Sequence, residues 1–247
     1  MTGTVELVQG RAEAAYATWP APTCVVSDGA YGVAGFPGDP DDVGALPAWY
    51  APHLDAWSRA ATPQTTLWFW NTELGWATLH PHLVARGWAY VACHVWDKGK
   101  GHVAGNANTR TLRQLPVVTE VCVQYVRPPT FPRPDGPPRT MQAWLRAEWD
   151  RTGLPRSRAN AACGVRDAAT RKYLAADAAW YMPPPAVFAA LAAYAQQHGD
   201  PAGRPYFAPP GGEAPYTAAA WAALRAKFRC PFGVTNVWSH PPVRGAE

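Results

Sequence analysis

The sequence predicts an α/β fold, and two patterns along the chain lead to this prediction. Short apolar runs rich in β-branched and aromatic residues, at 23–27 and 65–70, are typical of buried strands. A segment with apolar residues at helical spacing, 47–61, lies between them. Strands that alternate with helices indicate helices packed on a sheet. The 247 residues, 48% hydrophobic and 16% charged, suffice for a sizeable core and exclude a disordered chain.

The other elements follow from the same patterns and from the prolines. Six prolines fall within 127–138, which can therefore continue neither a helix nor a central strand, so we expect a boundary there. The remaining predicted elements are a helix at 78–87 closed by Gly87, strands at 88–96 and 120–126, helices over 140–195 broken at 183–185, a loop at 199–216 and an amphipathic helix at 217–228.

Charge is distributed unevenly along the chain. The first 126 residues have a net charge of −3, residues 127–172 carry 10 Lys and Arg against 4 Asp and Glu, and residues 173–247 have a net charge of +1. A basic block of this kind suits a polyanion such as nucleic acid. A solvated, arginine-rich surface is the alternative explanation.

Cysteine, histidine and hydropathy patterns restrict the setting. The five cysteines are far apart and form no C-x-x-C pair, which favours a reduced, cytoplasmic protein without disulfides or zinc. His80 and His82 are too close in sequence to share one helix face, so no metal site is expected. The chain has no apolar run that could span a bilayer and no signal-peptide pattern at its start.

A helix-turn-helix-like pattern lies inside the basic block, at 153–174. Ser157 can cap a first helix, Gly164 suits a left-handed turn, and Asp167 can cap a second helix. The polar residues around that second helix could then reach phosphates or base edges. The candidate DNA-binding residues are Arg158, Arg166, Thr170, Arg171 and Lys172. An ordinary helical hairpin would produce much the same pattern.

The strand 23–27 ends in an unusual tetrapeptide, Asp28-Gly29-Ala30-Tyr31. In an α/β sheet, chemistry gathers at the carboxyl ends of strands. Asp28 can accept a hydrogen bond from an amino group, the two small residues let a ring approach the backbone, and Tyr31 offers a face for stacking. An enzyme that acts on a base must hold the flipped base by its edge and its face. A plain βα turn is the alternative, because Asp-Gly is a common turn pair.

These four residues resemble the D-P-P-Y motif of the DNA amino-methyltransferases, which methylate adenine N6 or cytosine N4. The likeness extends over "VELVQGRAEAAYATWPAPTCVVSDGAYG", similar to the strand, turn, helix and strand that lead to the motif in these enzymes. It continues in "TTLWFWNTELGWATLHPHLVARGWAYVACHVWDKG", with a W-x-K-like element at its end, in "PVVTEVCVQYVR" and in "GVTNVWSHPP". The resemblance covers nearly the whole chain and is strongest over 23–126 and 233–242.

The resemblance implies roles for the residues of the motif. Asp28 would accept a hydrogen bond from the amino group of the target base, and Tyr31 would stack on the base. The methyl group would be transferred directly, without a covalent enzyme intermediate. An acidic first position favours adenine N6 over cytosine N4. Two positions depart from the family pattern: Gly29-Ala30 replaces Pro-Pro, and Gly10-Arg11 stands where Gly-Asp is common.

The resemblance also implies three regions: a catalytic half of a Rossmann-like methyltransferase domain at 1–126, a mainly helical target-recognition region at 127–232, and a return segment at 233–247. In family members with this order of motifs, the glycine-rich S-adenosylmethionine loop comes last, and the sequence stops before it. We therefore expect the cofactor-binding residues, unknown here, to lie on a second polypeptide or a missing C-terminal half. Strand 23–27 would then lie at an edge of its sheet.

The sequence therefore favours a component of an S-adenosylmethionine-dependent DNA methyltransferase that acts on double-stranded DNA, of the kind found in restriction–modification systems. Two alternatives stay open. The first is a non-catalytic DNA-binding module, a degenerate remnant of such an enzyme. The second is an α/β scaffold subunit that binds neither ligand.

Overall fold

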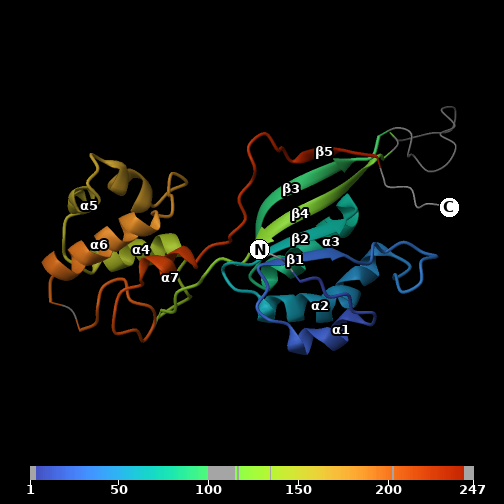
Figure 1. Ribbon diagram of the computed structural model, residues 1–247, viewed down its shortest axis with the longest axis horizontal. Coiled ribbons are helices and arrows are strands. Elements are labelled where there is room, and N and C mark those ends of the chain that lie inside the picture. The colour runs from blue at the N-terminus through green and yellow to red at the C-terminus, as the bar shows by residue number, and fades with distance from the viewer. Residues whose placement is uncertain (1–3, 100–114, 116, 134, 202, 242–247) are drawn as a thin grey trace. The chain divides into compact units, whose positions relative to one another are not determined.

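The computed structural model describes residues 4–99, 115, 117–133, 135–201 and 203–241. The chain divides into two compact units. Unit 1 comprises 1–127 with 226–247, and unit 2 comprises 128–225. Figure 1 shows the strands in unit 1 and a group of helices in unit 2.

Unit 1 contains a five-stranded sheet flanked by helices, which confirms the predicted α/β class. The strand order is β1-β2-β4-β3-β5; β1–β2 and β3–β5 are parallel pairs, whereas β4 is antiparallel to both its neighbours. The bounds of the four longer strands agree with the predicted bounds to within one residue at each end. The bounds are β1 Cys24–Asp28, β2 Thr66–Asn71, β3 Ala89–Asp97, β4 Thr119–Val126 and β5 Val237–Ser239.

Strand β1 lies at an edge of the sheet, because β2 is its only partner among the described residues. The edge position expected for this strand is therefore confirmed. Its five residues include neither Pro nor Lys, and Val26 is 65% exposed. Proteins normally blunt such an edge with charge, proline or a bulge. This edge is open to pairing with another strand.

Helices α2 (Leu46–Ala60) and α3 (Glu73–Ala85) pack against one face of the sheet (Figure 1). Leu67 and Phe69 alternate with Trp68 and Trp70 along β2, so only the first pair faces the helices. Thr72 caps α3 by accepting a hydrogen bond from the Gly75 backbone N–H at 3.1 Å.

The opposite face of the sheet carries a row of aromatic rings. The His94 ring lies between Trp68, at 5.0 Å, and Trp238, at 4.9 Å between ring centroids. Trp70 extends the row from Trp238 at 5.8 Å, and Trp96 follows at 5.9 Å. These rings therefore form a half-buried aromatic cluster on this face of the sheet.

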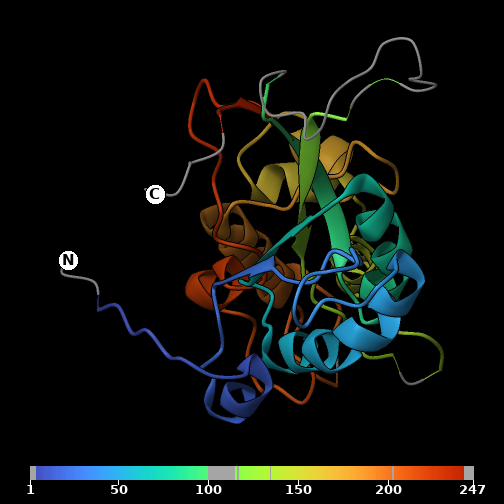
Figure 2. The ribbon, with the colours of Figure 1, turned by 90° about the vertical axis from the view of Figure 1, so that its right-hand side faces the viewer.

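The N-terminal segment differs from its prediction. The resemblance implies a strand before Gly10, but residues 4–9 form no strand, and Val5 and Leu7 are 83% and 93% exposed. Figure 2 shows this segment as an extended trace before α1 (Ala12–Ala15). A strand exists only where a neighbour supplies backbone hydrogen bonds, and no described strand pairs with these residues. The helix that should follow is short, α1 and the 3₁₀ turn η1 (Tyr16–Thr18).

Unit 2 is mainly helical, with a core of large aromatic side chains. Phe188 stacks on Trp221 at 4.0 Å between ring centroids, and Trp144 stacks on Phe131 at 4.3 Å. Its tryptophans thus serve the core. The predicted helix at 217–228 ends at Ala222, before the chain returns to unit 1. The elements are α4 Met141–Asp150, α5 Ser157–Ala162, the π-helix η4 Ala169–Tyr173, α6 Pro185–His198 and α7 Ala218–Ala222.

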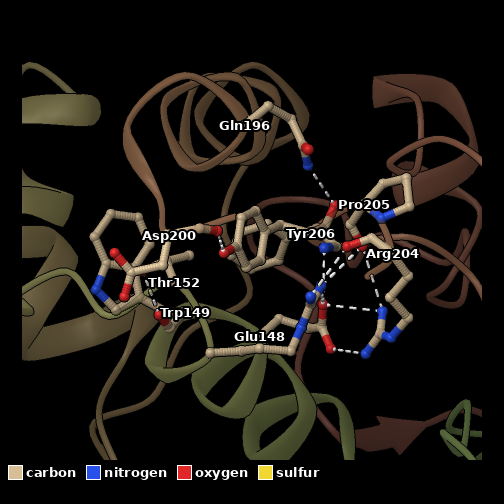
Figure 3. A network of polar contacts seen from close by, with 10 residues as sticks. Glu148, Trp149, Thr152, Gln196, Asp200, Arg204, Pro205 and Tyr206 are labelled. Carbon is tan, nitrogen blue, oxygen red and sulfur yellow. Dashed lines mark hydrogen bonds and ion pairs between the residues drawn. The ribbon is translucent and has the colours of Figure 1, made fainter. Parts of the chain in front are cut away.

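A buried carboxylate anchors the predicted loop at 199–216 to α4 (Figure 3). The Glu148 side chain is 2% exposed and accepts hydrogen bonds from Arg151 at 2.8 Å, from Arg204, and from the Phe207 backbone N–H at 2.9 Å. Phe207 has a left-handed φ of 55°, unusual for a bulky residue. Arg204 bonds both oxygens, so four hydrogen bonds fill the roughly four acceptor sites of the carboxylate, and this buried charge is compensated.

Candidate active site

The motif residues lie where the sequence places them, at the carboxyl end of β1. Asp28 is the last residue of that strand, and the Tyr31 hydroxyl donates to its Oδ1 at 2.8 Å. The Tyr31 Oη also lies 3.4 Å from Glu120 Oε2, and Lys98 Nζ donates to Glu120 Oε1 at 2.6 Å. Four polar side chains from three strands and their ends therefore form one chain of contacts.

The backbone of the motif is held by two buried side chains. The Ala30 carbonyl accepts a hydrogen bond from Tyr50 Oη at 3.0 Å and another from Asn71 Nδ2 at 2.9 Å. Tyr50 and Asn71 are fully buried, on α2 and at the end of β2. The motif thus has a defined conformation without the Pro-Pro pair of the family pattern.

Gly29 is required by the same packing. A Cβ at this position would lie 2.7 Å from Tyr50 Oη and 3.4 Å from the Trp49 ring. Tyr50 cannot retreat without losing its bond to Ala30. Any side chain at Gly29 would therefore displace the tyrosine that holds the motif.

The segment after the motif, 35–40, is tied back to it. Asp39 accepts hydrogen bonds from the backbone N–H groups of Tyr31, at 3.1 Å, and Gly32, at 2.8 Å. The Trp49 indole donates to the Gly38 carbonyl at 2.9 Å. Gly32 has a φ of +74°, and a Cβ there would lie 2.8 Å from the Val43 backbone. The segment is therefore a turn held by three hydrogen bonds.

Two cavities flank the motif. The larger, about 890 Å³, is lined by Tyr31, Phe36 and Trp49 on its apolar side and reaches Lys98 and Glu120. This is ample for a planar base and more, since ligand pockets commonly occupy roughly 300–1,000 Å³. Asp28 is not among the residues that line it.

The smaller cavity, about 230 Å³, lies on the other side of the motif and is the one that Asp28 lines. Aromatic rings surround it, among them Tyr16, His53 and Trp57. Tyr16 Oη lies 2.7 Å from His53 Nδ1 and accepts a hydrogen bond from the Trp57 indole at 3.2 Å. Burial lowers the pKa of His53, so its ring is neutral near pH 7.

The Tyr31 hydroxyl is held in its protonated form. Burial raises its pKa, and the hydrogen bond to Asp28 and the charge of Glu120 raise it further. Tyr31 therefore acts as a hydrogen-bond donor between the two carboxylates.

Two cysteines of the sheet are not activated as nucleophiles. Burial raises the pKa of Cys122 to about 12 and also raises that of Cys93, so both remain thiols at neutral pH. Within the described ranges, no three His, Cys, Asp or Glu side chains cluster to hold a metal ion. In the same part of the chain, no helix is long and apolar enough to cross a membrane.

The segment with the helix-turn-helix-like pattern matches its prediction only in its first half. Helix α5 forms, Ala159 is fully buried, and Gly164 has a φ of 63° in the turn. Ser157 is the first residue of α5 and does not cap it with its side chain. The expected second α-helix is a five-residue π-helix, η4. A single turn is too short to lie along a DNA groove as a recognition helix.

The candidate DNA-binding residues of this segment differ in availability. The Thr170 hydroxyl donates to the Asp167 carbonyl at 2.9 Å, and Arg171 pairs with the Asp167 carboxylate at 3.1 Å. Arg158, Arg166 and Lys172 are exposed, and no ion pair among the described residues includes them. These three basic side chains are the most accessible to phosphates.

Several residues of the site were not identified from sequence. Asn71 was the easiest of them to find from the sequence, because it is a polar residue at the end of an otherwise apolar strand. Asp39 lies eight residues after Tyr31 in a turn-forming stretch, and Tyr50 lies on a helix whose register alone does not point it at the motif. Their convergence depends on the packing of α2 and β2 against β1.

The comparisons with known proteins return structures only. No protein-family model matches the chain, and no curated protein matches it. One similar solved structure is the M1.HpyAVI–SAM complex, with 13% identity over 53% of this chain and 57% of that chain and a TM-score of 0.30. TTHA0409 of Thermus thermophilus, provisionally described as a DNA modification methylase, has 13% identity over 59% of this chain and 62% of that chain, with a TM-score of 0.34. The chain thus spans about three fifths of these structures, and TM-scores this low carry no argument about function.

Proposed function

We propose that unit 1 carries the target-base site of an S-adenosylmethionine-dependent DNA amino-methyltransferase, with adenine N6 favoured over cytosine N4. The observation that carries the proposal is the pairing of Asp28 and Tyr31 at the end of β1, on the walls of two adjoining cavities. Asp28 offers a carboxylate to the amino group of a base, and Tyr31 offers a ring on which the base can stack. The motif backbone between them is held by Tyr50 and Asn71.

The proposed reaction uses few protein groups. A flipped base enters the larger cavity and stacks on Tyr31. Its amino group donates a hydrogen bond to Asp28, which directs the nitrogen lone pair toward the methyl carbon. As the amino nitrogen accepts the methyl group it loses a proton, which passes to Asp28 or to water. S-adenosylmethionine supplies the methyl group when bound.

The residues around the smaller cavity suit the cationic end of that cofactor. Aromatic faces and a carboxylate attract a sulfonium, and Asp28, His53 and Trp57 lie together there. We infer that these side chains form one wall of the cofactor site. The second polypeptide expected from the sequence, which would supply the rest, belongs to the same proposal, as do a cytoplasmic location and a restriction–modification role.

The target-recognition role proposed for 127–232 rests on unit 2. Its exposed Arg158, Arg166 and Lys172 suit phosphate contacts on double-stranded DNA. The same observation favours the second candidate function, a DNA-binding module without catalysis. The two candidates share a DNA ligand and differ only in whether Asp28 and Tyr31 act on a base.

A methylation assay separates the two candidates. The chain is incubated with plasmid DNA and labelled S-adenosylmethionine, alone and with a polypeptide that carries a glycine-rich S-adenosylmethionine loop, and the methylated nucleoside is identified by mass. We expect N6-methyladenine, and none with Asp28→Ala. Unmethylated DNA that is nevertheless bound at low salt would favour the DNA-binding module.

A further inference from the structure

We propose that Glu120 is a positioning residue that accepts the Tyr31 hydroxyl when the amino group of a base takes its place on Asp28. This inference rests on the function proposed above and deepens it. It starts from a conflict at the site: the carboxylate assigned to the base is already bonded to Tyr31, at 2.8 Å.

The arrangement of the two cavities puts the Tyr31 hydroxyl between an entering base and Asp28. Tyr31 lines the larger cavity and Asp28 lines only the smaller one. A base in the larger cavity therefore meets Tyr31 before it meets Asp28. Its amino group reaches the carboxylate only after the tyrosine hydroxyl has moved away.

A displaced hydroxyl needs a new acceptor. Tyr31 is partly buried, and a buried donor without a partner loses the free energy of hydration without compensation. Glu120 Oε2 lies 3.4 Å from Tyr31 Oη, too long for a strong bond but within reach of a small ring movement. It is the second carboxylate already in contact with this hydroxyl.

Lys98 prepares Glu120 for this role. Its ammonium group binds Oε1 at 2.6 Å and leaves Oε2 directed at Tyr31. Both side chains are 23% exposed, and both line the larger cavity. In our proposal the tyrosine alternates between two acceptors: Asp28 when the cavity is empty and Glu120 when a base is present.

The test is a double-mutant cycle on base binding, with 9-ethyladenine as the probe and 9-ethylhypoxanthine, which lacks the amino group, as the control ligand. Affinity is measured in all variants from the NMR line widths of the ligand, and ring-labelled tyrosine reports separately on Tyr31, whose signal is assigned by its loss in Tyr31→Phe. We expect Glu120→Ala to lower the affinity for 9-ethyladenine about tenfold, which corresponds to the loss of one hydrogen bond to a charged group. In the Tyr31→Phe background the same change should have less than about a twofold effect, because no hydroxyl remains to be displaced.

Matched variants make the result specific. Glu120→Gln keeps a carbonyl acceptor and should restore most of the affinity. Tyr181→Phe and Glu213→Ala repeat the chemical changes at exposed positions in unit 2 and should change nothing. The Tyr31 signal should shift on adding 9-ethyladenine to the unmodified protein, and less so in Glu120→Ala.

The outcomes separate this inference from the proposed function. If 9-ethyladenine binds but Glu120→Ala weakens it equally with Tyr31 and with Phe at that position, the alternation is wrong and the base site stands. If the folded, unmodified protein binds 9-ethyladenine no better than 9-ethylhypoxanthine, the site does not select an amino group, and both proposals fail.

Discussion

Glu148 gives the sharpest test of how unit 2 is held together. Replacing it with Gln keeps the shape of the side chain and removes its charge. The residue joins α4 to the chain at 204–207 through Arg151, Arg204 and the backbone of Phe207 (Figure 3). A glutamine has one acceptor oxygen for these three donors and brings two donors of its own into the site.

The expected loss follows from the exposure of each partner. Breaking a fully buried ion pair costs about 3–5 kcal/mol. Here Arg151 is 26% and Arg204 50% exposed, so both regain hydration when the charge is lost. The buried Phe207 N–H keeps an acceptor if the amide oxygen turns toward it. We therefore expect Glu148→Gln to lower the free energy of unfolding by about 2–3 kcal/mol.

Urea unfolding monitored by tryptophan fluorescence measures this, with Asp150→Asn as the matched control. Asp150 lies on the same helix and pairs with Arg156 at 2.9 Å, but their side chains are 49% and 45% exposed. Such a surface pair contributes about 0–1 kcal/mol. If Glu148→Gln costs no more than Asp150→Asn, the carboxylate does not anchor the loop and the reasoning is refuted.

The same residue predicts a pH dependence. Burial raises the pKa of Glu148, but the hydrogen bonds from Arg151, Arg204 and the Phe207 N–H outweigh it, and the net shift is downward. A carboxyl with a lowered pKa in the folded state stabilises the protein above its unfolded pKa. This contribution is lost as the pH falls through the folded pKa. The difference between the unmodified protein and Glu148→Gln should therefore be full at pH 7 and shrink as the pH falls below about 4.

The remaining predictions concern the proposed function. Asp28→Ala should abolish methyl transfer in the complemented assay and leave duplex affinity in a gel shift nearly unchanged, since phosphate contacts carry most of it; loss of binding with residual methylation would refute its role. Tyr31→Ala should weaken base capture by about 1–3 kcal/mol through lost stacking, and Tyr31→Phe far less; equal losses would point to the hydroxyl instead. Lys172→Ala should reduce the slope of log affinity against log salt by about one; an unchanged slope would exclude a phosphate contact. We expect the protein to self-associate through the open edge of β1 in sedimentation velocity, and Val26→Lys to reduce this, because a charge blunts the edge; association that Val26→Lys leaves unchanged would assign it to another surface.

The sequence by itself determined the four longer strands of unit 1, helix α2 and the position of the motif at the end of β1. The reason is local: β-branched and aromatic runs favour strands wherever a sheet can receive them, and Asp28 follows such a run directly. The strand that the resemblance implies at residues 4–9 was wrong, because the apolar alternation there has no described strand to pair with. The local rules were themselves wrong after Gly164, where they predicted a second α-helix: Asn160 instead binds the backbone of Ala169 and Thr170, and a π-turn forms.

Only the tertiary structure decided which distant side chains meet. Tyr50 and Asn71 converge on the Ala30 carbonyl, Asp39 folds back onto Tyr31, and Glu120 reaches that tyrosine from 89 residues away. The sequence also does not reveal that the Glu148 side chain is buried whereas that of Asp150, two residues further on, is half exposed. Such contacts depend on helix rotation and strand register, which are set by the packing of the whole core, so the residues concerned do not reveal their partners in the sequence.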